Sequence, residues 1–155
     1  DSTYNEYVFY FTDINVSANS DNFTFQVNAS GQSGFNEEMT TTSFRAYHNE
    51  GGSTHGLDID SGAQSQNAGT AYQTLSQSLG NGADECCAGE LHLFNPASTT
   101  YATQFYSRFN GHHDSDFSMG DFISGYINTT AAITQISFKP ESGTFDGNIY
   151  MFGVK

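Results

Sequence analysis

The sequence predicts an all-β fold: an antiparallel β-sandwich, jelly-roll-like, with about eight to ten strands. The chain has 155 residues, with 14 Phe and 9 Tyr but no Trp, and aromatic residues favour half-buried strands. Sixteen Gly, with many Ser, Thr and Asn, supply the turns that join short strands. Apolar residues recur with a period of two, and no helical period is sustained for three turns. We therefore expect no helix of substantial length.

The length of the chain favours one domain over residues 1–155, large enough to bury a core. No linker-like stretch rich in Pro, Gly or Ser divides it, and no internal repeat is visible. The first residue is Asp rather than Met. We expect either a processed terminus or one domain of a longer chain.

Strands in the first half are predicted from alternation and from the turns that separate them. The clearest lies at residues 22–28, where Phe23, Phe25 and Val27 alternate with Thr24 and Gln26, as in a strand with one face buried. Residues 50–69 are poor in apolar side chains and predict a surface loop with an edge strand at 57–60. The other strands expected in this half are residues 7–12, 40–48 and 70–75.

The second half predicts a hairpin and a docked C-terminus. A strand at 89–95 ends at the Asn95-Pro96 pair, and residues 101–109 are its expected partner. Residues 111–120 are polar and predict a loop. The closing strands are expected at 121–128, 133–139 and 149–154, with a Gly-containing turn at 141–148.

The net charge of −13 excludes two classes of partner. The fixed cations are only Arg45, Arg108, Lys139 and Lys155, too few to neutralise nucleic-acid phosphates. The same deficit argues against an anionic membrane surface. A solvated acidic surface is the expected meaning of the charge, rather than a store of divalent cations.

The densest group of potential metal ligands is His112, His113, Asp114 and Asp116. Neighbouring His residues point to opposite sides of a strand, so both reach one metal only if the loop folds back. Asp114 and Asp116 are the residues to hold Ca²⁺ if any is bound. We expect an ordinary polar loop here, with no metal and no cofactor.

No motif predicts an enzyme. There is no Gly-x-Ser-x-Gly elbow, and acidic neighbours oppose thiolate formation at the adjacent Cys86 and Cys87, expected to be small buried side chains. A glycosidase needs two carboxyl groups in a cleft. The acids that such a site would draw on are Asp13, Asp21, Asp58, Asp60, Asp114 and Asp116. We expect no catalytic residues.

Exposed Tyr and Asn suit contacts with sugars, since a ring stacks on a pyranose face and amides bond hydroxyl groups. A carbohydrate-binding module is therefore the alternative function, and it predicts such residues clustered on one loop edge or one sheet face. The tyrosines considered are Tyr47, Tyr72, Tyr101, Tyr106 and Tyr126.

Three stretches resemble small virion proteins of tailed bacteriophages, notably those that infect marine bacteria and cyanobacteria. They are residues 7–31 (YVFYFTDINVSANSDNFTFQVNASG), 36–44 (NEEMTTTSF) and 125–155, which end in GNIYMFGVK. That ending is similar to the group's usual close of Gly, Ile, an aromatic residue, Gly, an aliphatic residue and Lys, with Phe152 where Tyr is more usual.

The resemblance implies a non-enzymatic β-sandwich subunit of a virion, either a capsid decoration protein or part of a tail or fibre. Its expected partners are other virion proteins and further copies of itself, with a host-surface glycan as a further partner. The aromatic strands at each end are expected to reach a neighbouring subunit through Phe9, Phe11, Tyr150 and Phe152.

Overall fold

The computed structural model describes residues 2–59 and 64–155, and within these ranges the chain forms ten strands and no helix. The all-β fold is therefore confirmed, with the strand number at the upper end of the prediction. No described helix is long and apolar enough to cross a membrane. In chain order the strands are β1 (Glu6–Val16), β2 (Asp21–Ala29), β3 (Met39–Asn49), β4 (His55–Ile59), β5 (Gln73–Leu79), β6 (Cys87–Phe94), β7 (Gln104–His113), β8 (Phe117–Ile127), β9 (Ile133–Pro140) and β10 (Phe145–Val154).

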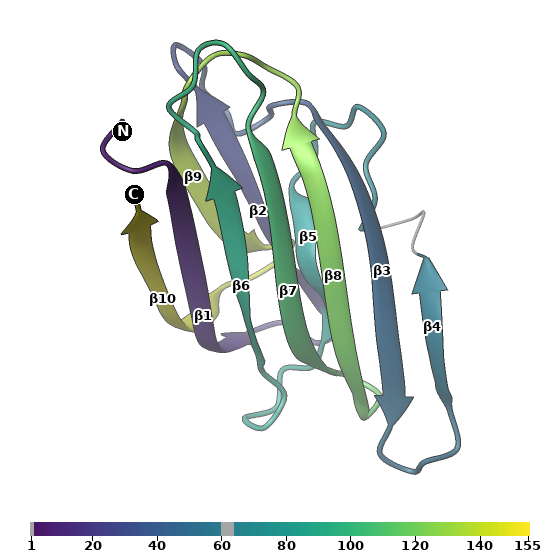
Figure 1. Ribbon diagram of the computed structural model, residues 1–155. Coiled ribbons are helices and arrows are strands. Elements are labelled where there is room, and N and C mark those ends of the chain that lie inside the picture. The colour runs from purple at the N-terminus through teal and green to yellow at the C-terminus, as the bar shows by residue number, and fades with distance from the viewer. Residues whose placement is uncertain (1, 60–63) are drawn as a thin grey trace.

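The strands form two layers, as Figure 1 shows. Seven antiparallel strands in the order β10-β1-β6-β7-β8-β3-β4 make the large sheet, and β5-β2-β9 make the small sheet behind it. In the strand register of the described chain, one residue pair joins the two layers, Leu79 of β5 with His113 of β7. The sandwich-like arrangement leaves the face of the large sheet away from the small sheet uncovered; we call it the outer face.

Phenylalanine rings fill the space between the layers. Phe11 on β1 lies 5.8 Å from Phe23 on β2 and 5.1 Å from Phe109 on β7, measured between ring centroids. Phe25 on β2 meets Phe105 on β7 edge to face at 5.1 Å. Each such pair contributes about 0.5–1.5 kcal/mol beyond the area that it buries. The alternation read from the sequence thus corresponds to a core of interlocked rings.

The prediction of one polar, exposed face on β2 was wrong. Thr24 and Gln26 are both fully buried, and two loop segments contact Gln26. The Gln26 side-chain amide donates to the carbonyl oxygens of Glu37 and Ala71, at 2.9 and 3.0 Å. A buried amide is tolerated when it is satisfied in this way.

The predicted loop at 111–120 is also corrected, because β7 continues to His113 and β8 begins at Phe117. Only three residues form the turn between them. Asp116 has a positive φ of 60°, and its amide donates to the His113 carbonyl oxygen at 3.0 Å. The predicted edge strand corresponds to β4, although Asp60 lies outside the described residues.

The C-terminal strand β10 pairs with β1 along most of its length and has no further neighbour among the described strands. The predicted docking of this end is therefore observed, at the edge of the large sheet. A bulge at Asp13 interrupts the pairing opposite Gly147. Gly147 has a φ of 121°, and a side chain there would place Cβ 2.6 Å from the Asp13 carbonyl oxygen. Glycine is required at this position.

Candidate ligand-binding face of the large sheet

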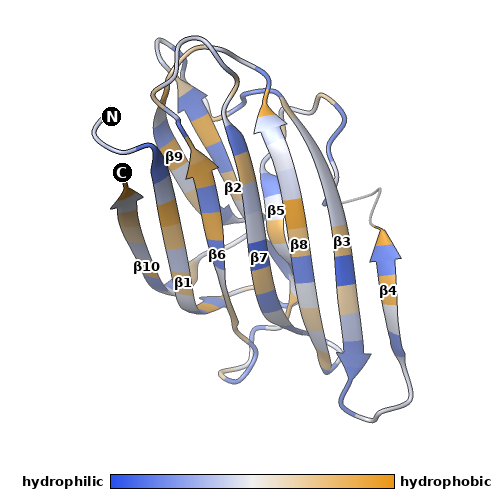
Figure 2. Cartoon of the chain, viewed as in Figure 1, coloured by the Kyte–Doolittle hydropathy of each residue, from blue (hydrophilic) through white to orange (hydrophobic). Residues whose placement is uncertain are grey.

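A row of side chains crosses the outer face from one edge of the large sheet to the other. Residues opposite one another on paired strands lie on the same face, so the register of the sheet defines the row. Figure 2 shows the alternating hydropathy that results along β6. This central row runs, strand by strand, through Tyr150, Tyr10, Glu90, Arg108, Phe122, Phe44 and Ile59.

Several rings of this face are exposed although they are large. The exposed fraction is 43% for Tyr10, 45% for Phe44 and 39% for Tyr106. Phe44 and Phe122 stack in parallel, with centroids 4.7 Å apart and an angle of 6° between the rings. Contiguous exposed aromatic surface is uncommon on soluble proteins and marks sites of interaction. This is the strongest indication of a binding function in the molecule.

A second row lies beside the first and adds polar groups to the rings. Its members on adjacent strands include Phe152, Val8, His92 and Tyr106. The His92 ring stacks on the Tyr106 ring at 4.4 Å, and its Nδ1 lies 2.5 Å from the Glu6 carboxylate. The pKa of the Tyr106 hydroxyl is raised, first by desolvation and then by nearby carboxylates. The phenol stays protonated and able to donate a hydrogen bond.

Two open hollows of about 430 Å³ each lie on the outer face, and Glu90, Arg108 and Phe122 line both of them. Tyr10 borders the first hollow and Phe44 the second. The Arg108 guanidinium carbon lies 5.4 Å from the centroid of the Phe122 ring. Aromatic rings, a carboxylate and a guanidinium group therefore lie together in the middle of the outer face.

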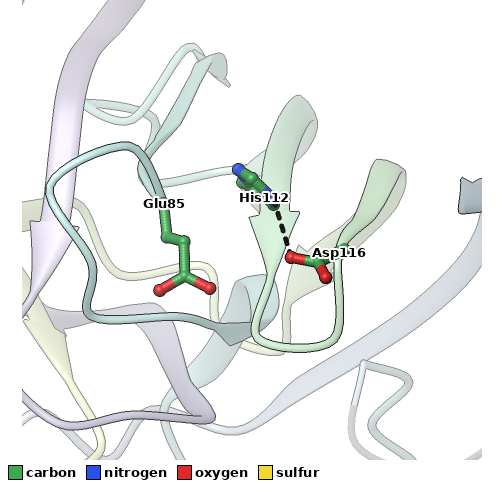
Figure 3. A group of neighbouring side chains, drawn as sticks. All are labelled: Glu85, His112 and Asp116. Carbon is green, nitrogen blue, oxygen red and sulfur yellow. Dashed lines mark ion pairs between the residues drawn. The ribbon is translucent and has the colours of Figure 1, made fainter. Parts of the chain in front are cut away.

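The structure divides the four predicted metal ligands into two pairs. His113 Nδ1 lies 2.7 Å from the Asp114 carboxylate, whereas His112 Nε2 is 3.9 Å from that of Asp116. Glu85 joins the second pair: the ligand atoms of Glu85, His112 and Asp116 lie within 4.8 Å of one another (Figure 3). Sequence reasoning missed Glu85 because the loop before β6 brings it to the hairpin.

This trio offers one imidazole and two carboxylates, whereas Ca²⁺ prefers six to eight oxygen ligands. The His112 Nδ1 atom is 3.1 Å from the carbonyl oxygen of Asp84, so a proton on Nδ1 is shared with the backbone. Such a set resembles transition-metal ligation more than calcium binding. Asp116 is exposed, and exposed acidic groups of this kind are common without a metal.

The acids considered for a glycosidase lie in different settings. Asp58 on β4 faces Arg45 at 3.8 Å, and Asp60 lies outside the described residues. The Asp21 carboxylate is buried and accepts hydrogen bonds from the Ser142 amide and hydroxyl groups, at 3.1 and 3.0 Å. Asp21 thus fastens a turn. The partners of Asp58 and Asp21 are those of structural carboxylates.

Cys86 and Cys87 are both free. Cys87 is buried at the start of β6, as expected, whereas Cys86 is only partly buried. Burial is the main cause that raises the pKa of the Cys87 thiol, followed by the charges of Cys86 and Asp121. The sequence predicted a protonated thiol from the acidic residues nearest to it in the chain. Those residues are not the leading cause of the raised pKa. Cys87 has the environment of an inert core thiol.

The four residues expected at an interface also separate. Phe9 and Phe11 belong to the core, with exposed fractions of 5% and 1%, so they are not available to a partner in this fold. Tyr150 and Phe152 are 49% and 53% exposed and share the outer face with Tyr10. Of these four residues, only Tyr150 and Phe152 on β10 therefore remain candidates for contact with another subunit.

The tyrosines considered for sugar binding are likewise divided. Tyr106 and Tyr126 lie on the outer face, whereas the Tyr72 hydroxyl donates to Ser137 on β9 and Tyr101 lies in a loop. Tyr10, Phe44, Phe122 and Arg108 were not identified from the sequence. Their strands alternate between two faces, and this is the signal that the sequence offers. It indicates a cluster of these side chains only once the pairing register of the strands is known.

Comparisons of the chain with protein-family models, with curated proteins and with solved structures found no match.

Proposed function

We propose that this chain is a non-enzymatic binding protein whose outer face holds a neutral carbohydrate. The observation that carries the proposal is the cluster of exposed rings around Glu90 and Arg108 on one sheet face. A pyranose has an apolar C–H face that packs on an aromatic ring, and hydroxyl groups at its rim that bond charged and amide groups. The outer face offers both kinds of contact side by side.

The charge of the protein favours a neutral ligand. The chain carries −13 overall, and Arg108 is the only fixed cation in the central row, opposite Glu90 in the register. An anionic glycan would gain one favourable contact there and approach a negatively charged molecule. A neutral sugar forms hydrogen bonds to both groups at no such cost.

A glycan array tests this function. The wild-type chain should retain neutral oligosaccharides, and Phe122→Ala should lower the signal on the same spots. Tyr101→Ala is the matched control, because it removes an exposed ring, 72% accessible, that lies outside the outer face. An array without a reproducible neutral ligand, or equal signals from Phe122→Ala and the wild-type chain, would refute the proposal.

A structural subunit of a phage virion, either capsid decoration or tail-fibre component, is the second candidate. It is favoured by β10, an edge strand of ten residues whose outer backbone groups have no partner strand in the described chain. Its only charged residue is Asp146, and an uncharged edge permits strand addition from another subunit. Light scattering of the purified chain and immunogold labelling of virions test this role. A monomeric mass together with unlabelled particles would exclude it.

A further inference from the structure

The central row presents its groups at the spacing of the strands. From Tyr10 on β1 to Phe44 on β3 the row crosses β6, β7 and β8, one residue per strand. Neighbouring strands lie about 4.8 Å apart, so these five residues span about 19 Å. A ligand that contacts all of them must be long and flat.

The side chains of the central row follow one another in a defined order of chemical types. A ring at Tyr10 is followed by the carboxylate of Glu90 and the guanidinium of Arg108, and then by the stacked rings of Phe122 and Phe44. Aromatic residues thus lie on both sides of a central pair of hydrogen-bonding groups. A hexose in an extended, equatorially linked chain advances by a length close to the strand spacing, so successive sugars meet successive strands.

The row continues to both edges of the sheet. Tyr150 on β10 is 49% exposed and Ile59 on β4 is 83% exposed. The two hollows adjoin each other through Glu90, Arg108 and Phe122 and are open to solvent. A site for the end of a sugar chain needs an enclosing pocket, whereas an open row that reaches both edges accommodates the middle of a chain.

We infer that the ligand is an extended, neutral, β-1,4-linked hexopyranose chain that lies across the strands along the central row, rather than a terminal monosaccharide. This inference rests on the proposed function and makes it more specific. Neutrality follows from the single row cation facing a carboxylate, in a protein of net charge −13. The binding mode predicts that affinity depends on the number of sugar units.

Calorimetric titration with cello- and manno-oligosaccharides of one to six units tests the inference. Affinity should increase by about tenfold or more from the monosaccharide to the pentasaccharide, because each added unit that packs against an aromatic residue gains about 2- to 12-fold. The gain should become smaller beyond five units, because only Tyr150 and Ile59, at the two ends of the central row, are left to contact. An oligogalacturonide of six units, which is acidic, should bind more weakly than its neutral counterpart.

Phe44→Ala tests the part of the row on β3. It should lower the affinity for chains of five and six units more than the affinity for the monosaccharide, and Tyr101→Ala should change neither. Equal affinity for one unit and for six would overturn the extended binding mode while the proposed function stands. Tighter binding of the acidic hexamer would overturn neutrality. Failure of every sugar in both array and titration would refute the proposed function and this inference with it.

Discussion

Arg108 on β7 lies over the ring of Phe122 on β8, with its guanidinium carbon 5.4 Å from the ring centroid. The two residues are direct cross-strand partners in the large sheet. The contact holds a long, flexible cation beside this ring on the outer face, where its N–H groups are able to donate to a ligand. The positive charge of Arg108 and the aromatic ring of Phe122 therefore lie side by side on the outer face.

The first prediction concerns the side chain of Arg108. Arg108→Gln should weaken binding of a neutral oligosaccharide about 2- to 12-fold, because loss of a hydrogen bond to the ligand costs about 0.5–1.5 kcal/mol. Calorimetric titration measures the change. Lys139→Gln is the control: it removes a cation that lies 4.3 Å from the Tyr72 ring, away from the outer face. Equal effects of the two changes would contradict the role given to Arg108.

The second prediction concerns the core. Phe11 is 1% exposed and contacts three other phenylalanine rings, those of Phe23, Phe109 and Phe138. Phe11→Ala should lower the free energy of unfolding by about 3–5 kcal/mol. Urea denaturation followed by tyrosine fluorescence measures this change. Phe152→Ala, at a half-exposed ring of β10, should cost much less, and a similar cost for both would argue against the core described above.

The third prediction concerns the bulge between β1 and β10. Gly147→Ala should destabilise the chain by more than about 1 kcal/mol, because its positive φ and the nearby Asp13 carbonyl oxygen both exclude a side chain. Gly51→Ala, in an open turn with ordinary φ, should change stability by about 0.5 kcal/mol or less. Thermal unfolding of both variants decides the point. A neutral Gly147→Ala would show that β10 can shift against β1.

The fourth prediction concerns a buried carboxyl group beneath the large sheet. Asp121 on β8 is fully buried and accepts hydrogen bonds from Gln64 at 2.7 Å and Ser76 at 3.2 Å. Burial raises the pKa of this carboxyl above its ordinary value of 3.8, although the hydrogen bonds and Arg45 oppose the shift. The folded chain therefore retains this proton at a pH where the unfolded chain has lost it.

The contribution of Asp121 to stability should thus fall as pH rises from about 4 through the raised pKa, and stay constant above it. Asp121→Asn carries no charge at any pH and should remove this part of the slope. Urea denaturation at several pH values between 4 and 7.5 measures both chains. A slope that is unchanged in Asp121→Asn would mean that other groups produce it.

The sequence was sufficient for the local part of the fold. The strand around Phe23 was predicted because apolar and polar residues alternate in it, although both of its faces are buried. The extension of β7 and β8 to His113 and Phe117 was missed. Polar residues at a hairpin tip pair through their backbones, and their side chains carry no pattern that distinguishes a strand from a loop.

The candidate site could not be predicted from the sequence, for a related reason. Tyr10 lies beside Glu90 although 80 residues separate them in the chain, and no local pattern indicates that β1 pairs with β6. The burial of Gln26 was missed in the same way, because loop segments distant in sequence cover it. Contacts between non-consecutive strands decide which aromatic residues become core and which form the outer face.

Amide chemical-shift mapping tests the central claim most directly. The isotope-labelled chain is titrated with a neutral hexasaccharide, and shifts are assigned along the backbone. The largest changes should lie on β1, β6, β7, β8 and β3, around Tyr10, Glu90, Arg108, Phe122 and Phe44. Shifts confined to the β7–β8 turn or to the small sheet, or none at saturating sugar, would contradict the assignment of binding to the outer face.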